Sequence, residues 1–207
     1  MENFTLIATV TVIHFLGLIS PGPDLIMAVK NSVSYSRKIG VFTAIGFGLG
    51  ISVHIFYCLA GLALLISQSI VIFNIIKLLG AAYLMYIGFQ AFFSKSTLVD
   101  VHAKQVKNAI TPFQAVKMGF LTNLLNPKVT LFFLSLFTLV LSPNTPTPIL
   151  VITSVIMILN TVLWFSFMAV LFTQEKVKSA FNKSYGIFNK ILGGMLMALG
   201  TRVALSE

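Results

Sequence analysis

The sequence predicts an all-α integral membrane protein with six transmembrane helices. Of its 207 residues, 57% are hydrophobic and only 9% are charged, whereas soluble domains carry roughly 25% charged residues. The mean hydropathy is +0.96. Uncharged runs cover residues 39–76, 78–94 and 129–174. Because one spanning helix needs about 20 apolar residues, the last run can hold two spans. These observations exclude a water-soluble globular domain.

Turn-forming residues divide the apolar sequence into six spans. We place them near residues 4–29, 39–66, 70–92, 113–141, 148–173 and 185–205. The connections are short, so residues 1–207 are predicted to form a single transmembrane domain. The N-terminus carries Glu2 and no basic region, which argues against a cleaved signal peptide. We therefore expect the first span to remain in the mature protein.

The first span is interrupted near its end by Pro21, Gly22 and Pro23, with Asp24 directly after them. Proline removes its own backbone donor and clashes with the preceding helical turn. Lipid offers no replacement hydrogen bond, so we expect this break to face the protein interior or a wet cavity. The helix ends created there carry partial charges of about half a unit. Such ends can hold the charged groups of a small zwitterion.

The fourth span contains a second break of the same kind, at Asn126, Pro127 and Lys128. Aligning Pro23 with Pro127 places Asp24 opposite Lys128. Each half of the chain therefore begins with a helix that is broken by proline, and a charged residue directly follows that proline.

A further correspondence links the third and sixth spans. The segment "KLLGAAYLMYIG" from Lys77 resembles "KILGGMLMALG" from Lys190. Each half then holds three spans, and an odd number makes the halves face opposite ways across the membrane. We predict two inverted repeats, about 4–92 and 113–205, joined by a loop at about 93–112. This arrangement is typical of secondary transporters.

The basic residues predict the orientation of the chain. The formal net charge is +9, and ten of the fourteen basic residues lie in or beside alternate connections. The connections around residues 67–69 and 142–148 hold none. Basic loops stay in the cytoplasm, so both termini are expected outside, and the charge is no argument for a nucleic-acid partner. The ten residues are Lys30, Arg37, Lys38, Lys95, Lys104, Lys107, Lys176, Lys178, Lys183 and Lys190.

Asp24 is the leading candidate for the functional site, because it is the only acid inside a predicted span. An ionisable group in the membrane is costly and usually functional. Asp24 could bind a proton, an amino group, or both in alternation, as an antiporter needs. The alternatives are a helix cap, a solvated position at the cytoplasmic end, or a fixed ion pair with Lys128. Lys128 is either a site residue or a snorkelling anchor.

Four further polar residues are weaker candidates. Asn123 and Asn126 flank the second break and could bind freed backbone groups or substrate. His14 and His54 lie in apolar runs, where histidine suits a proton relay but more often packs with a hydrogen bond. His14 precedes the first break by about two turns, which makes it the better of the two.

The glycines and the cysteine have simpler interpretations. Gly46 and Gly50 form a small-x-x-x-small pair, which predicts close helix packing. Cys58 is the single cysteine, so it can form neither a disulfide nor a thiolate metal site within one chain. Packing is its expected role.

Four segments together resemble the LysE/RhtB family of small bacterial exporters of amino acids and their derivatives. They are "SPGPD", "YSRKIGVFTAIGFGLG", "KLLGAAYLMYIGFQAF" and "GFLTNLLNPKVTLFF". They occur in the family's order and cover nearly the whole chain. The resemblance implies export across the bacterial inner membrane, exchange for protons, a homodimer as a possible assembly, and no cofactor. Its motif positions in this sequence are Pro21, Gly22, Pro23, Asp24, Asn126, Pro127 and Lys128.

The single intramembrane acid favours neutral amino acids such as threonine, homoserine or leucine, because a dicationic substrate would call for more acids. A divalent metal cation exporter is the alternative, although it would need several oxygen or sulfur ligands. A membrane enzyme would need a nucleophile with a base, or paired carboxylates. A structural subunit would leave the paired breaks without a purpose.

Overall fold

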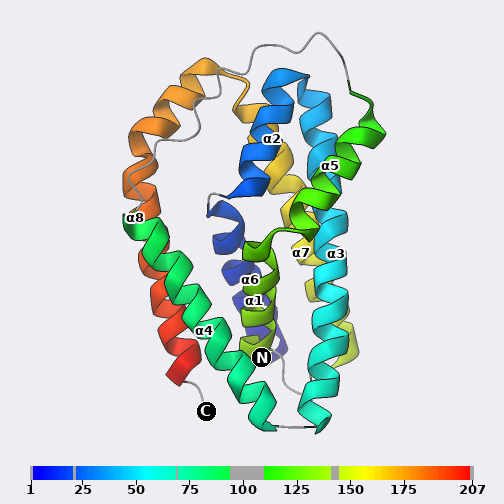
Figure 1. Cartoon of the computed structure of the whole chain (residues 1–207), viewed down its shortest axis with the longest axis vertical. Helices are drawn as coiled ribbons and strands as arrows, with labels where there is room; N and C mark the ends of the chain where they lie inside the picture. Colours follow the sequence, from blue (N-terminus) through cyan, green and yellow to red (C-terminus); the bar gives the residue numbers. More distant parts are fainter. Residues whose placement is uncertain (1, 21, 69, 94–109, 141–144, 206–207) are drawn as a thin grey trace.

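The computed structural model describes residues 2–20, 22–68, 70–93, 110–140 and 145–205, and these residues form eight α-helices. The helices follow one another in the order drawn in Figure 1. They are α1 (Glu2–Ile19), α2 (Pro23–Ser34), α3 (Arg37–Gln68), α4 (Ile70–Phe93), α5 (Pro112–Leu124), α6 (Pro127–Val140), α7 (Thr147–Leu171) and α8 (Glu175–Leu205). The prediction of an all-α protein is confirmed.

Both predicted helix breaks are present. The break after α1 bends the chain by 60° before α2, and the break after α5 bends it by 59° before α6. Proline is at or next to the first position of α2 and α6, where its missing N–H costs nothing. Pro21 itself lies outside the described residues.

Only some of these helices are long and apolar enough to cross a membrane. Arg37–Gly61 and Thr147–Leu171 are long and apolar enough, and each bent pair qualifies if it is counted as one span. The described chain therefore offers two spans, or up to four. Within α4, the apolar segment Lys77–Phe93 is shorter. The last helix begins at Glu175, ten residues before the start predicted from hydropathy. The prediction missed these first turns because they are polar, and hydropathy detects only the apolar part of a helix.

The helices are arranged so that the polar side chains Asp24 and Asn126 at the two breaks are buried, whereas Pro23, Leu125 and Pro127 are exposed. The pair α4 and α8 forms one flank, and α3 packs against α5 and α7 on the other side (Figure 1). In this view α1, α2 and α6 lie between these flanks. Both chain termini lie at one end of the molecule, and the α2–α3 and α7–α8 connections lie at the opposite end.

Glycine allows the closest helix contacts, as predicted for Gly46 and Gly50. A Cβ atom on Gly46 would lie under 3.0 Å from backbone atoms of Val116 and Phe120 on α5, and one on Gly50 would lie 2.5 Å from Asn123 Oδ1. On the other flank, a Cβ atom on Gly193 would lie 2.5 Å from the Gly88 carbonyl oxygen. The α3–α5 and α4–α8 interfaces are therefore backbone-to-backbone contacts.

Apolar side chains fill the interior and also cover the outer surface. Phe47, Phe133 and Leu136 are fully buried, whereas Phe56 and Phe89 are exposed on the outside of the bundle. An exposed apolar surface of this kind suits contact with lipid. The lone Cys58 is buried in the core, as predicted.

Candidate functional site

The candidate site forms where the two helix breaks meet. Asp24 is in the first turn of α2, and its side chain is only 5% exposed. Its carboxylate accepts a hydrogen bond from Asn123 Nδ2 at 2.7 Å and one from Asn126 Nδ2 at 3.1 Å. Asn123 is in the last turn of α5, and Asn126 lies in the break between α5 and α6. Asp24 is therefore neither solvated nor limited to capping its own helix, and it joins the two bent pairs.

Lys128 makes the reciprocal connection. Its Nζ atom donates a hydrogen bond of 2.7 Å to the carbonyl oxygen of Ser20, at the end of α1. Its own backbone N–H is capped by Asn126 Oδ1 at 3.0 Å. A cation is favourable at the carboxyl end of a helix, where carbonyl groups lack intrahelical partners. Lys128 therefore satisfies the first break, while Asp24 is held by the second.

Gly22 lies beside the side chain of Lys128. A Cβ atom at this position would lie 3.4 Å from both Cδ and Nζ of Lys128. The residue is extended, with a φ of −174° that any residue can adopt. Neither the backbone conformation nor the distance to the lysine therefore requires a glycine at this position.

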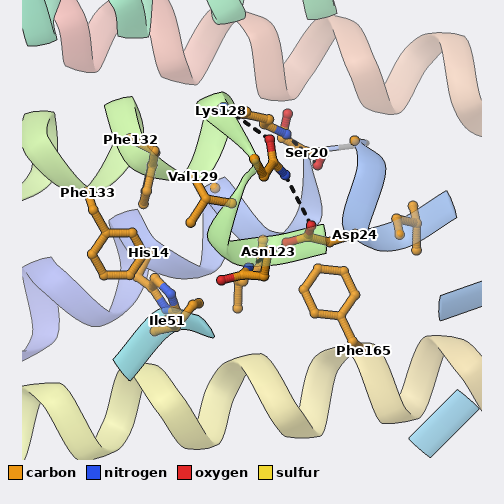
Figure 2. A pocket seen from close by; sticks show the side chains of 15 residues that line it. His14, Ser20, Asp24, Ile51, Asn123, Lys128, Val129, Phe132, Phe133 and Phe165 are labelled. Carbon is orange, nitrogen blue, oxygen red and sulfur yellow. Dashed lines mark hydrogen bonds between the residues drawn. The ribbon is translucent and has the colours of Figure 1, made fainter. Parts of the chain in front are cut away.

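These groups line a cavity of about 430 Å³, its open mouth included. Figure 2 shows Asp24 and Asn123 near the middle, Lys128 and Ser20 on one side, and His14 and Phe133 toward the other. Apolar side chains complete the wall, among them Ile51, Val129, Phe132 and Phe165.

His14 lies in the apolar part of the wall. Its side chain is 1% exposed, and its ring meets Phe133 edge-on with centroids 5.7 Å apart. Neither ring nitrogen has a hydrogen-bond partner among the described residues. An unpartnered buried polar group is costly and uncommon. His14 therefore offers an open hydrogen-bonding position in this cavity.

The structure gives His54 a different place. Its Nε2 atom lies 3.2 Å from the Asn123 carbonyl oxygen, and its Nδ1 atom lies 2.5 Å from the Tyr57 hydroxyl. Because a carbonyl only accepts, Nε2 carries the hydrogen and Nδ1 accepts from Tyr57. His54 thus contacts the backbone carbonyl of Asn123, and it is not among the residues that line the cavity.

Of the predicted site residues, His14, Gly22, Asp24, Asn123, Asn126 and Lys128 line one cavity. Pro23 and Pro127 begin the two helices beside it. The sequence did not point to Ser20 or to the aromatic wall. Ser20 could have been found, because a helix that ends before proline leaves its last carbonyl oxygens without partners. Nothing local distinguishes Phe132, Phe133 and Phe165 from the other phenylalanines.

Asn123 has one further property that bears on ligand binding. Its Oδ1 atom is buried and has no hydrogen-bond partner among the described residues, while its Nδ2 atom is bound to Asp24. An acceptor without a donor therefore lies beside the carboxylate. Within the described chain, no group of three or more His, Cys, Asp or Glu side chains is placed to hold a metal ion.

Comparison with known proteins identifies the family. The family model described as LysE type translocator matches residues 15–207. A membrane protein of Bacillus subtilis (strain 168), named YrhP and uncharacterized, is 32% identical over 91% of this chain and 93% of its own. The threonine efflux protein of Escherichia coli (strain K12) is 30% identical over 98% of both chains. The leucine efflux protein of Salmonella choleraesuis (strain SC-B67) is 36% identical over 56% of this chain and 54% of its own.

No solved structure matches the chain significantly. The family match spans nearly the whole sequence, and it agrees with the two proline breaks and with the apolar helices around them. This chain belongs to the LysE family of translocators, so it is a membrane transporter and not an enzyme.

Proposed function

We propose that the protein exports neutral amino acids from the cytoplasm in exchange for protons. The relatives named for threonine efflux and for leucine efflux support the substrate class. The observation that carries the proposal is the pair of opposite charges in one cavity, with Asp24 on α2 and Lys128 on α6. An amino acid is a small zwitterion, and it needs one partner of each sign.

The cavity offers a place for each part of such a substrate. The ammonium group binds the Asp24 carboxylate, beside which Asn123 Oδ1 has no hydrogen-bond partner among the described residues. The substrate carboxylate binds the Lys128 ammonium group. Lys128 then gives up its hydrogen bond to the Ser20 carbonyl oxygen for a hydrogen bond to a charged acceptor, which is stronger. The substrate side chain lies against the phenylalanine wall, where His14 can meet a hydroxyl group.

Neutral amino acids suit this cavity best. Asp24 is the only acidic residue among those that line it, and Lys128 adds a positive charge of its own. A substrate with a cationic side chain would bring a second buried positive charge without a second acid to balance it. Unpaired buried charge is expensive.

Exchange for protons is expected because the proton and the substrate ammonium group compete for one carboxylate, that of Asp24. A protonated Asp24 no longer attracts the substrate ammonium, so proton and amino acid bind alternately. Alternating exposure of the cavity to the two sides then converts proton entry into amino-acid exit. In this proposal the bent pairs belong to two inverted repeats of three spans each. The protein lies in the bacterial inner membrane with the basic connections in the cytoplasm and both termini outside.

Transport by the purified protein tests the proposal. Proteoliposomes with an acidic interior receive a panel of labelled amino acids, using the native chain, Asp24→Asn and the charge-matched control Glu175→Gln. We expect the native chain and the control to accumulate threonine or leucine, and Asp24→Asn to fail. Failure of the native chain to move any amino acid would overturn the proposal. Movement of divalent cations in the same vesicles would then favour the metal alternative.

A further inference from the structure

We infer that a second cavity, between α1, α6 and α7, is the vestibule through which the amino acid leaves the binding cavity toward the outer face. The cavity measures about 320 Å³, its open mouth included. Its lining includes Leu6 and Val10 of α1, Leu136 and Phe137 of α6, and Thr153 and Met157 of α7. The inference rests on the proposed export function, which supplies the direction of transport.

The two cavities follow one another along the same helix faces. On α1, His14 lines the binding cavity and Val10, one turn earlier, lines the second cavity. On α6, Phe133 and Phe137 have the same relationship. Residues four apart in a helix lie on one face. A substrate that moves along these faces passes directly from one cavity to the other.

The third helix shows the same continuity over two turns. Phe165 of α7 lines the binding cavity, and Met157 lines the second one. Thr161 lies between them and is fully buried, with its hydroxyl donated to the Met157 carbonyl at 2.9 Å. All three helices therefore present one continuous face to both cavities.

Two aromatic rings form the partition between the cavities. Phe133 and Phe137 are stacked, with centroids 5.9 Å apart, and both are buried. Phe133 also meets His14, the unpartnered histidine of the binding cavity. In this proposal the partition opens when these two side chains change rotamer.

The opposite end of the molecule is closed by close packing. Gly46 and Gly119 bring the backbones of α3 and α5 into contact. Asn31 of α2 donates to Thr43 of α3 at 2.9 Å, and Ser32 of α2 donates to the Ala169 carbonyl of α7. At the other end, the second cavity lies between α6 and α7, with Leu136 and Phe137 on one side and Met157 on the other. The N-terminal turns of α1, which line this cavity, lie at the end that holds both termini (Figure 1).

The chemistry of the second cavity suits passage rather than retention. Its two hydroxyl groups, on Thr153 and Ser154, donate to carbonyls of their own helix at 2.6 and 2.7 Å. The described lining otherwise consists of apolar side chains. A zwitterion binds weakly to such a surface, and conduction requires binding weak enough for the substrate to leave.

Cysteine labelling tests the vestibule, because Cys58 is the only native cysteine. Single cysteines replace Val10 or Ala115 in a Cys58→Ser background. Ala115 is the control, since it is also buried but belongs to α5 and does not line the second cavity. A membrane-impermeant thiol reagent is added outside intact cells. We expect it to modify Val10→Cys and to reduce efflux by that variant at least tenfold relative to the same cells before modification. We expect Ala115→Cys to stay unmodified.

A bulky variant separates the vestibule from the binding cavity. Val10→Trp should lower efflux at least tenfold while the purified protein keeps its thermal stabilisation by threonine or leucine, whereas Asp24→Asn should lose both. Normal efflux by Val10→Trp, or no reaction of Val10→Cys, would overturn the vestibule and leave the export function standing. A native chain that neither binds nor exports amino acids would instead overturn the proposed function.

Discussion

Asp24 and Lys128 each follow a proline at the start of a helix, and each is hydrogen-bonded to the break of the other bent pair. The Asp24 carboxylate binds Asn123 and Asn126 beside the second break, and Lys128 Nζ binds the Ser20 carbonyl at the first. Each bent pair thus carries one charged side chain that is hydrogen-bonded to the other pair. A movement that separates the two pairs must break these three hydrogen bonds. The residues proposed to bind substrate are therefore also the ones that hold the two pairs together.

Lys128→Met should weaken substrate binding strongly. The variant keeps the length of the stem but loses the ammonium group, so the substrate carboxylate has no cation and the Ser20 carbonyl has no donor from this side chain. Hydrogen bonds to charged groups contribute about 1.5–3 kcal/mol, which corresponds to a KM increase of roughly 10- to 150-fold. Efflux measured against intracellular amino-acid concentration checks this. Lys128→Arg keeps the charge and should retain part of the activity, and equal losses in both variants would contradict a role for the charge.

Asn126→Ala should affect both breaks. It removes one donor from Asp24 and the cap on the Lys128 backbone N–H. Loss of a helix cap costs about 0.5–2 kcal/mol, so we expect a lower melting temperature together with weaker transport. Asn126→Asp restores the cap acceptor but places a second acid beside Asp24. Recovery of stability without recovery of transport by Asn126→Asp would match the double role, and unchanged stability in Asn126→Ala would count against it.

His14→Leu should change selectivity more than total activity. The substitution keeps the wall apolar and removes the two ring nitrogens that have no partner among the described residues. One neutral hydrogen bond contributes about 0.5–1.5 kcal/mol. We therefore expect the efflux of threonine to fall roughly 2- to 12-fold relative to that of leucine. His54→Leu is the comparison, because His54 supports Asn123 from outside the cavity. An unchanged ratio in His14→Leu would remove this residue from the site.

Gly193 and Gly194 offer a matched pair for the packing of α4 and α8. A Cβ atom on Gly193 would lie 2.5 Å from the Gly88 carbonyl oxygen and from the Phe92 nitrogen, whereas one on Gly194 would meet nothing within 4 Å. Gly193→Ala should therefore lower thermal stability, by about 1–3 kcal/mol. Gly194→Ala should raise it by about 0.5–1 kcal/mol through helix propensity. Equal melting temperatures for the two variants would show that the helices do not pack at Gly193.

The helix breaks could be predicted because proline acts locally. The sequence placed them at Pro21–Pro23 and Asn126–Pro127, and α2 and α6 begin at Pro23 and Pro127. The start of the last helix was predicted less well, since hydropathy reports where a helix is apolar and not where it begins. Glu175 opens α8 in a polar segment that is helical without being apolar.

Contacts between distant segments could not be predicted in the same way. The hydrogen bonds of Asp24 join residues about 100 positions apart, and a single sequence carries no signal for such pairs beyond the charge and the break. The two histidines illustrate the limit. The distance from the first break favoured His14 over His54, and His14 does line the cavity, but only the fold shows that His54 contacts the Asn123 carbonyl from outside it.

The most direct test of the central claim is the dissociation constant of threonine or leucine, measured on the purified protein as a function of pH. If one carboxylate binds either the proton or the ammonium group, the dissociation constant of the native chain must rise tenfold for each pH unit below the point where Asp24 is protonated. Asp24→Asn should bind more weakly and show no such slope. The same slope in both proteins would contradict the claim, because the competing proton would then bind elsewhere.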